Sequence, residues 1–367
     1  MEAPKAEMFA VAIVYIKPIE LRAITVMLDE RWWNPVSSAP GDGNEYTLGR
    51  IGEHNVILVG PPRGAQGTVA TAQFISTIRL TFPNIAVGLL VGIGGGIPRY
   101  PQHDVRLGDV VVGAPESGPA VVQYDLGKRT ESGFETNRVL AKPPGLLLQV
   151  VNKVENKSQY IQEGEDGLLK PHLTRLTRYP RLKKEFEKPS TPDRLFDPTF
   201  SHEPGTDCDN HGWWLDVKRH EREPRDDIVI HYSTILSGGT LMKSPKDRDM
   251  LSAKHNDALC IEMEAAGLMD VFPCLVVRGV SDYADSHKNS AWQGFAAATA
   301  ASYAREVLIN MSKQMVPEPQ ADSSSGGVNM ASPQENKNPH ILLSTHRNSG
   351  VQVGYNTGSV TNHSGGR

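Results

Sequence analysis

Cysteine is scarce in this chain of 367 residues, and no hydrophobic run reaches the length of a membrane span. A transmembrane helix needs about 20 consecutive apolar residues. The three cysteines, Cys208, Cys260 and Cys274, are too few and too scattered for a disulfide framework or a four-cysteine zinc site. The N-terminal residues do not form a signal-peptide pattern. We therefore expect a cytoplasmic protein with free thiols.

An excess of charge of either sign is also missing, since the formal net charge is −4. Nucleic-acid and membrane-surface proteins usually carry a marked basic excess, so we expect neither partner. Cys208 and His211 could ligate a metal, but two ligands without further partners are a weak signal. The sequence therefore predicts no metal site and no cofactor.

Short apolar runs alternate with helical patterns over the first 315 residues. The sequence predicts strands at 8–16, 55–59, 85–91, 109–112, 228–236 and 273–280, and helices at 18–28, 67–80, from 264, and at 292–311. This alternation is typical of an α/β fold with a mixed central β-sheet covered by helices on both faces. Residues 1–315 are expected to form one such domain.

Two polar stretches interrupt or follow this pattern. Residues 155–227 are rich in Lys, Arg, Glu and Pro, which predicts a solvated insertion or, alternatively, a cationic lid built on Arg175, Arg178, Arg181, Lys183 and Lys184. Residues 316–340 are rich in Pro, Ser, Gly, Asn and Gln and are expected to form a flexible linker. Residues 341–367 form a third region.

Acidic residues follow two of the predicted strands. Met263 and Glu264 lie in Cys-Ile-Glu-Met-Glu-Ala-Ala-Gly (260–267), and Ser281 and Asp282 lie in Val-Ser-Asp-Tyr-Ala-Asp (280–285). Open α/β sheets bind ligands at the carboxyl ends of their strands. We therefore expect both carboxylates at the ends of neighbouring strands, with Glu20 joining them from the helix after the first strand.

These three carboxylates fit the cleavage of a nucleoside. Breaking the bond between ribose and purine needs an acid at the base, a carboxylate at the sugar hydroxyls and a base for the attacking water. Asp282 is the candidate acid because burial favours the protonated form of a carboxyl group. Glu264 is the candidate sugar ligand and Glu20 the candidate base. Alternatively, Glu20 and Glu264 are acidic residues that complement helix dipoles.

Four segments together resemble the nucleoside phosphorylase/nucleosidase superfamily, above all its 5′-methylthioadenosine/S-adenosylhomocysteine nucleosidases. They are Ile-Glu-Met-Glu-Ala-Ala-Gly, Val-Ser-Asp-Tyr-Ala-Asp, Val-Gly-Ile-Gly-Gly-Gly (91–96) and Arg-Leu-Gly-Asp-Val-Val-Val (106–112). Segments 122–128, 231–239 and 282–289 resemble the version found in fungal NLR-type immune proteins.

The resemblance implies roles for individual residues. Asp282 would protonate the purine, Glu264 and Met263 would contact the ribose beside Ser281, and Glu20 would activate water. Ser237, Gly238, Leu241 and Met242 would lie near the purine.

The glycine-rich segment bears on the reaction type. The superfamily usually has Ser or Thr at the position of Ile93, and the phosphate-clamping Gly-Asp-Pro-x-Arg loop is replaced by residues 16–22. An apolar side chain cannot bind an oxyanion, which favours hydrolysis over phosphorolysis. The amides around Gly94 and Gly95 could still hold an anion.

Cations near the predicted strand ends could hold a 5′-triphosphate, because relatives in the immune-type group act on adenosine or ATP. The candidates are Lys17, Arg22, Arg63, Lys243, His287 and Lys288. They could equally be scattered surface charges.

The last region alternates Val351, Val353 and Tyr355 in a stretch without charge or proline, which is typical of a cross-β stacking segment. It resembles RIP homotypic interaction motifs and fungal amyloid-signalling motifs, with Val351, Gln352, Val353, Gly354 and Asn356 as the motif residues. A flexible glycine-rich terminus is the alternative. The resemblance implies templating by another copy or by an NLR receptor.

The sequence thus predicts an adenine-releasing N-ribosyl hydrolase, homo-oligomeric and switched on through its tail as a cell-death or defence effector. The alternatives are a housekeeping methylthioadenosine/S-adenosylhomocysteine nucleosidase, a purine nucleoside phosphorylase, and a non-catalytic nucleotide-binding adaptor.

Overall fold

The computed structural model describes residues 3–313 except 35, 66, 132, 137, 139, 163–164, 203–215 and 224–226. The chain divides into a unit of Met1–Gln320 and a second unit of Ala321–Arg367. The second unit, which contains the predicted cross-β segment, lies outside the described residues, and so do Cys208 and His211. The predicted domain boundaries therefore stay predictions.

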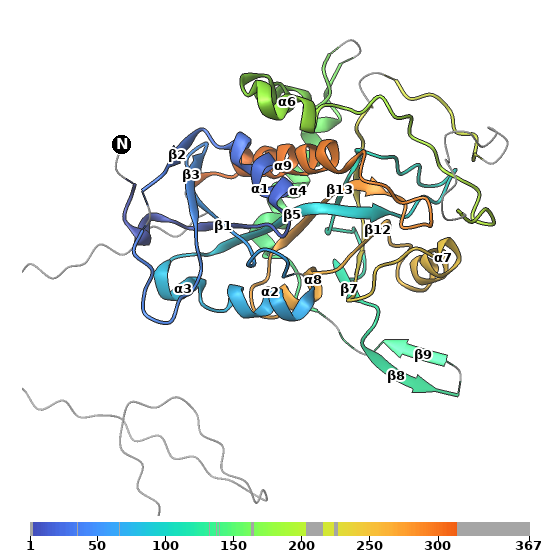
Figure 1. Ribbon diagram of the computed structural model, residues 1–367, viewed down its shortest axis with the longest axis horizontal. Helices are drawn as coiled ribbons and strands as arrows, with labels where there is room; N and C mark the ends of the chain where they lie inside the picture. Colours follow the sequence, from blue (N-terminus) through green and yellow to red (C-terminus); the bar gives the residue numbers. More distant parts are fainter. Residues whose placement is uncertain are drawn as a thin grey trace, which may run out of the picture. The chain divides into compact units, whose positions relative to one another are not determined.

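Eleven of the described strands form one mixed sheet (Figure 1). Its main order is β10-β6-β13-β5-β1-β4-β3-β2, and β12, β11 and β7 continue from β5. The strands of this sheet are β1 Val11–Val14, β2 Glu30–Trp32, β3 Thr47–Ile51, β4 His54–Val59, β5 Val87–Gly96, β6 Val110–Val112, β7 Val121–Gln123, β10 Ile230–Tyr232, β11 Ile235–Ser237, β12 Cys260–Glu262 and β13 Leu275–Asp282. A separate hairpin pairs β8 Gly127–Thr130 with β9 Gly133–Thr136.

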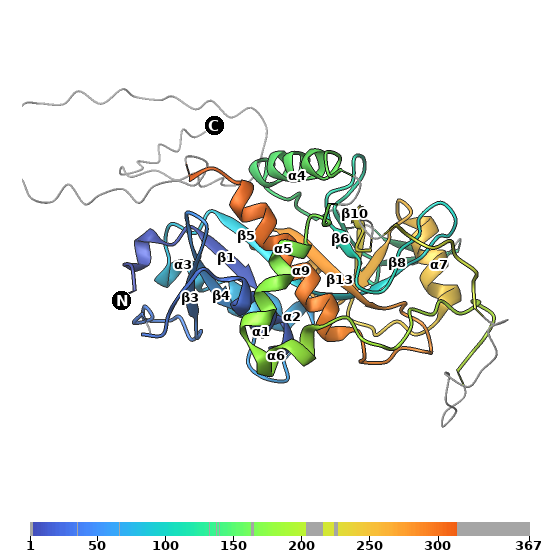
Figure 2. The same ribbon diagram turned by 90° about the horizontal axis from the view of Figure 1, so that it is seen from above.

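Helices cover both faces of this sheet (Figures 1 and 2). They are α1 Pro18–Met27, α2 Thr68–Ile75, α3 Ile78–Thr81, α4 Gly145–Ser158, α5 Lys170–Leu173, α6 Pro180–Phe186, α7 Pro245–Lys254, α8 Ala265–Leu268 and α9 Gln293–Asn310, with short 3-10 helices at Ala6–Met8 and Thr174–Arg178. Alternate residues of β1 face opposite layers. Val11 and Ile13 pack with α1, α4 and α9, whereas Ala12 and Val14 pack with α2, α3 and α8.

The predicted α/β class is confirmed, and several element boundaries are corrected. The predicted strand 228–236 is two strands, because the chain changes partner after Tyr232: β10 pairs with β6, and β11 pairs with β7 and β12. The predicted helix 67–80 is likewise two helices, α2 and α3. The helix expected from residue 264 is a single turn, α8.

The two strands that lead to Glu264 and Asp282, β12 and β13, are not neighbours in the sheet as the sequence predicted. They lie on either side of β5. Strands β12 and β13 both pair with β5 near its carboxyl end, at Gly95 and Gly96 for β12 and up to Gly95 for β13. The glycine run is the carboxyl-terminal part of β5, which extends beyond the predicted strand 85–91. Strand β5 therefore lies between the two acidic segments.

The described part of the polar insertion packs against the α1 and α9 layer. Helices α5 and α6 contact α9, and Arg175 pairs with Asp29 at 3.1 Å while donating to the Leu28 carbonyl oxygen at 2.8 Å. Arg22 of α1 is ion-paired with Glu185 of α6. No helix within the described residues is long and apolar enough to span a bilayer.

The contact between β13 and α9 generates a prediction about stability. A Cβ atom added at Gly279 would lie 1.9 Å from the Ala296 carbonyl oxygen, which belongs to the backbone of α9 and cannot turn away. We expect Gly279→Ala to destabilise the fold by roughly 1–3 kcal/mol or more, the usual cost of overpacking. Thermal unfolding would show a lower midpoint. Gly43→Ala, whose new methyl group would meet no atom within 4 Å, is the matched control, and an unchanged midpoint for Gly279→Ala would contradict this packing.

Candidate active site

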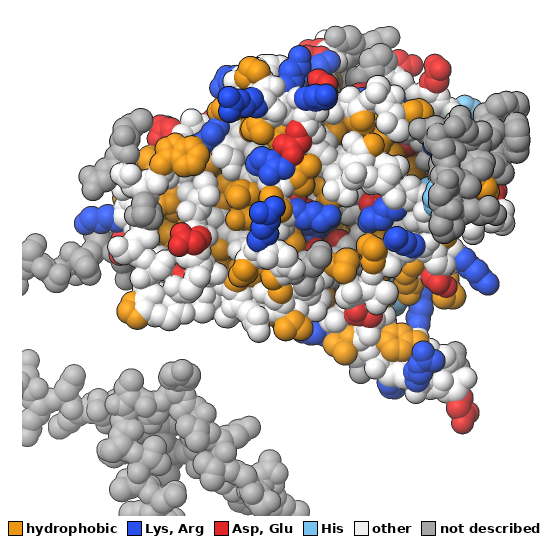
Figure 3. All heavy atoms as spheres, in the orientation of Figure 1, with side chains coloured by type: hydrophobic (Ala, Val, Ile, Leu, Met, Phe, Trp, Pro, Cys, Tyr) orange, Lys and Arg blue, Asp and Glu red, His pale blue; other side chains and the backbone are white. Residues whose placement is uncertain are grey.

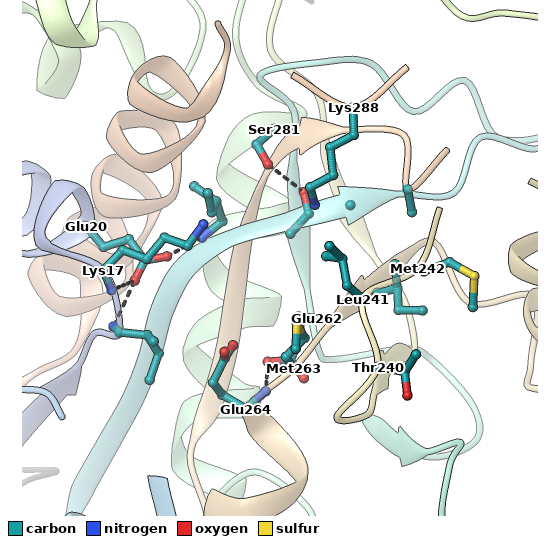
Figure 4. Close-up of a pocket in the computed structure, with 16 residues that line it drawn as sticks. Lys17, Glu20, Thr240, Leu241, Met242, Glu262, Met263, Glu264, Ser281 and Lys288 are labelled. Carbon is teal, nitrogen blue, oxygen red and sulfur yellow. Dashed lines mark hydrogen bonds between the residues drawn. The ribbon is translucent and has the colours of Figure 1, made fainter. Parts of the chain in front are cut away.

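A cavity of about 260 Å³ opens beside the carboxyl end of β5 (Figure 4). Its walls come from the residues around the start of α1, the end of β5, residues 240–242, the β12–α8 segment, and the end of β13 with the residues that follow it. The lining residues are Ile16, Lys17, Glu20, Ile93, Gly94, Gly95, Thr240, Leu241, Met242, Ile261, Glu262, Met263, Glu264, Ser281, Ala284 and Lys288. Segments far apart in the sequence therefore meet at one site.

Glu20 forms one wall of the cavity and is held by backbone amides. Its Oε2 accepts hydrogen bonds from the N–H groups of Ile16 and Lys17, both at 2.8 Å, and its Oε1 accepts one from Ile93 at 2.9 Å. The side chain is only 2% exposed. These three donors fix the position and orientation of the Glu20 carboxyl group at the cavity wall.

Glu264 forms a second wall and belongs to a buried acidic cluster around Arg278. Arg278 Nη2 contacts Glu262 Oε2 and lies 3.5 Å from Glu264 Oε2. Glu262 also accepts hydrogen bonds from the amides of Glu264 and Ala265, at 3.1 and 3.0 Å. Burial raises the pKa of Glu264 to about 7; Arg278 opposes this rise, whereas Glu262 and Glu20 add to it. Glu264 therefore keeps its proton to a higher pH than an exposed glutamate does.

The glycines of β5 give these side chains room. A Cβ atom at Gly92 would lie 2.4 Å from Arg278 Nη1 and 2.5 Å from Glu20 Oε1. At Gly95 it would lie 2.8 Å from the Ala284 Cβ and 3.1 Å from Asp282 Oδ1. The amide of Ile93 donates to Glu20 and is therefore not free for an anion, whereas anion binding by the amides around Gly94 and Gly95 stays a prediction.

Asp282 lies behind the cavity wall that Ser281, Ala284 and Lys288 form. Its Oδ2 accepts hydrogen bonds from Ser281 Oγ at 2.8 Å and Lys288 Nζ at 2.9 Å, and its Oδ1 accepts one from the Ala284 amide at 3.0 Å. Asp282 itself lines a smaller neighbouring cavity of about 60 Å³ with Arg194, Phe196 and others. Three donors, one of them an ammonium group, therefore surround the carboxyl group of Asp282, and its predicted role as the acid stays a prediction.

Apolar side chains form the remaining wall. Leu241, Met242, Ile261 and Met263 line the cavity, and the first two of these with Met263 are residues that the sequence predicted for the site. Two other predicted purine contacts do not line it: Ser237 is fully buried and accepts a hydrogen bond from the Ala266 amide, and Gly238 packs against the Tyr124 ring.

Two of the six predicted phosphate-binding cations line the cavity. Lys17 and Lys288 reach it from opposite sides (Figure 4). Lys288 is ion-paired with Asp282, whereas Lys17 has no ion-pair partner among the described residues. Arg22 is paired with Glu185, His287 stacks on Phe196, and Arg63 and Lys243 are exposed elsewhere. Lys and Arg side chains also gather across the middle of the face drawn in Figure 3. No described residue of 155–227 lines the cavity, so the lid alternative has no support there.

Sequence reasoning missed Glu262 and Arg278. Glu262 lies within the motif 260–267, but the role of sugar ligand was given to Glu264 two residues later. Arg278 interrupts the apolar run Leu-Val-Val-Arg-Gly-Val, and a charge inside a buried strand was the available signal, since such charges are nearly always paired.

The predicted motif residues Val351, Gln352, Val353, Gly354 and Asn356 lie outside the described residues. No group of three or more potential metal ligands occurs within the described parts of the chain.

Comparison with solved structures identifies the fold. A futalosine hydrolase of Helicobacter pylori superposes with a TM-score of 0.51 at 17% identity, covering 82% of this chain and 97% of that one. A 5′-methylthioadenosine/S-adenosylhomocysteine nucleosidase of Neisseria meningitidis gives 0.52 at 16% identity, with 82% and 98% covered. This chain therefore has the fold of these nucleosidases, as the motif resemblance predicted.

Relatives by sequence are found among longer proteins. A nucleotide-binding leucine-rich repeat (NLR)-like protein of Hyaloscypha variabilis is 38% identical over 312 residues, which are 84% of this chain and 30% of the relative. The ATP nucleosidase Cap17 of Escherichia coli is 35% identical over 86 residues, 22% of this chain and 17% of Cap17. No family model matches the chain. These similarities support the superfamily resemblance.

Glu264 generates a prediction about pH. The folded protein keeps the Glu264 proton up to a pKa of about 7, whereas the unfolded chain releases it near the usual 4.5. The stabilisation is therefore complete below about pH 4.5 and is lost as the pH rises through 7. We expect Glu264→Gln, which cannot ionise, to gain stability relative to the wild type between pH 5 and pH 8 in thermal unfolding. Glu53→Gln, on an exposed turn, should show no such change, and parallel curves for Glu264→Gln and wild type would refute the shift.

Proposed function

We propose that this chain is a purine N-ribosyl hydrolase that releases adenine from adenosine or ATP-type nucleotides. The observation that carries the proposal is the cavity in which the amide-bound Glu20, the buried Glu264 and the Ser281–Lys288 wall converge. The nucleosidase fold and the 35% identity with part of an ATP nucleosidase support it.

The geometry suits a dissociative hydrolysis. Glu264 would receive the ribose hydroxyls, and its ionised form, which a pKa of about 7 leaves partly populated near neutral pH, would stabilise the positive sugar as the bond to the purine breaks. Glu20 would take a proton from the attacking water. The apolar wall of Leu241, Met242 and Ile261 would hold the purine beside the Ser281–Lys288 wall, where a proton is needed.

Water is favoured over phosphate as the nucleophile. The Ile93 side chain lines the cavity where an anion-binding hydroxyl would be needed, and the Ile93 amide already donates to Glu20. The Glu20 carboxyl group already accepts the amide hydrogen bonds at this wall, so they are not available to a phosphate ion.

The activity would serve a cell-death or defence effector. We infer that a homo-oligomer forms, and that another copy or the matching segment of an NLR receptor templates the 341–367 tail into a fibril and switches the enzyme on. The similarity to an NLR-like protein supports this context.

Adenine release is the first activity prediction. Purified protein incubated with ATP, adenosine and methylthioadenosine, with and without phosphate, should release adenine from ATP or adenosine without phosphate. Chromatography of the free base and the sugar product measures it. Glu20→Gln should lower the rate by about 100-fold or more, because general-base catalysis contributes about that much.

The outcomes separate the alternatives. Preference for methylthioadenosine would favour the housekeeping nucleosidase, and phosphate-dependent formation of ribose 1-phosphate would favour a phosphorylase. Nucleotide binding without turnover would favour the adaptor. Lys17→Met serves as an internal comparison: it should weaken turnover of ATP but not of adenosine if Lys17 holds the phosphates.

The tail supports a separate prediction. Uncharged, proline-free segments stack in register, and a carboxylate repeated along the stack would repel its own copies. We expect Gln352→Asp or Gly354→Asp to abolish thioflavin-positive assemblies of the full chain, whereas Gln352→Asn keeps them. Fibrils that persist in both aspartate variants would count against the motif.

A further inference from the structure

The loop 238–242 connects β11 to α7 and contributes Thr240, Leu241 and Met242 to the cavity wall. The Leu241 side chain is 50% exposed although it borders the cavity. Its apolar surface is thus available for a ligand to cover, as in most small-molecule sites. An exposed loop presents a fixed wall only if neighbouring segments hold its backbone in place.

Two side chains of the segment 122–128 hold this backbone. The Tyr124 hydroxyl group donates to the Thr240 carbonyl oxygen at 2.9 Å, and the Gly239 amide donates to Asp125 Oδ2 at 2.6 Å. Neither Tyr124 nor Asp125 belongs to the described lining of the cavity. Any influence that they have on a bound ligand therefore passes through the loop.

Tyr124 is the better protected of the two partners. Its side chain is buried, and burial raises its pKa to about 12, with Asp125 and Glu262 adding to the rise. The hydroxyl group therefore keeps the proton that it donates to the Thr240 carbonyl oxygen over the whole ordinary pH range. Asp125 is exposed, so water competes for the Gly239 amide and this second hydrogen bond contributes less.

Gly238 allows the Tyr124 ring to lie against the loop backbone. A Cβ atom at this position would lie 2.5 Å from Cε1 and 2.6 Å from Cζ of the ring, closer than such atoms can approach. The sequence placed Gly238 near the purine, but its observed contact is with Tyr124. The absence of a side chain at this position is thus part of the same attachment.

We propose that Tyr124 and Asp125 are positioning residues for base binding, which hold Leu241 and Met242 where the purine lies. This rests on the proposed function. It gives a role to the segment 122–128, for which the sequence suggested a kinship but no function. The loop would contact the purine equally in the bound substrate and in the transition state. Loss of an attachment should therefore raise KM and leave kcat nearly unchanged.

Tyr124→Phe tests the stronger attachment, because it removes the hydroxyl group and keeps the ring. We expect KM for adenosine or ATP to rise by about 5-fold, which corresponds to one hydrogen bond of ordinary net strength, with kcat within about twofold of the wild type. Tyr160→Phe, at a side chain that is 75% exposed, is the matched control and should change neither constant. An unchanged KM, with or without a fall in kcat, would overturn the proposal.

Equilibrium dialysis with adenine measures base binding without turnover. Asp125→Ala should weaken adenine binding by about 2-fold to 5-fold, since the lost hydrogen bond is exposed. Asp125→Asn keeps an oxygen that can accept from the Gly239 amide, so it should restore most of the affinity. An equal loss in both variants would show that the hydrogen bond is not what matters, and would contradict the proposed role of Asp125.

A double-mutant cycle tests whether Gly238 acts through Tyr124. Gly238→Ala should displace the ring and weaken adenine binding, and Tyr124→Phe added to it should cost little more, because the same hydrogen bond is already lost. Fully additive losses would contradict this coupling. A wild-type protein that binds adenine but releases it from no nucleoside would refute the proposed function alone. An active wild type whose Tyr124→Phe variant binds adenine normally would refute the positioning role alone.

Discussion

The buried guanidinium of Arg278 is the group on which the site depends. It lies at the middle of β13, is fully buried, and carries Glu262 and Glu264 as its carboxylate neighbours. Burial would by itself lower the pKa of Arg278, but the surrounding carboxylates raise it above its usual range. Removing one partner of such a cluster leaves an uncompensated buried charge, which typically costs about 3–5 kcal/mol. Glu20, Glu262 and Glu264 can line one cavity because the positive charge of Arg278 offsets the repulsion between their carboxyl groups.

A second ionic network joins the polar insertion 155–227 to Asp109 before β6 and to Tyr283 after β13. Arg222 pairs with the fully buried Asp109 at 2.7 Å, and Asp109 also accepts from His231 at 2.9 Å. Burial opposes the ionisation of Asp109, but Arg222 and His231 together hold its pKa below the usual range. Tyr283, the residue after Asp282, donates to Asp193 and accepts from Arg219 at 2.9 Å. Arg222, Arg219 and Asp193 of the insertion thus hold the segments on either side of the turn that carries Asp282 and Lys288. These ion pairs and hydrogen bonds explain why a charged stretch with few apolar residues belongs to the folded unit.

The sequence predicted the parts of this arrangement that follow from strand ends and missed those that need pairing partners. Glu20 and Glu264 were predicted because each lies shortly after a predicted apolar strand, and both line the cavity, although β12, which Glu264 follows, runs antiparallel to β5. The split of 228–236 could not be predicted, because Ser233 and Thr234 give no turn signal and only the competing partners β6 and β7 separate the two strands. Lys288 was recognised as a cation, but its ion pair depends on a turn closed by the Ala284 amide. Arg278 was missed because periodicity describes which face a residue occupies and not what it pairs with.

The balance of charge around the cavity bears on which substrates can enter it. Four carboxylates, Glu20, Glu262, Glu264 and Asp282, face three cations, Lys17, Arg278 and Lys288. With Glu264 protonated, as its pKa of about 7 allows near neutral pH, the charges cancel. A phosphorylated nucleoside would then meet no net repulsion, whereas at higher pH the ionised Glu264 would oppose it. Arg278 and Lys288 are already occupied by carboxylates, so within the described lining Lys17 is the cation left for a 5′-phosphate. Discrimination between nucleoside and nucleotide would therefore rest on one lysine and on the protonation of one glutamate.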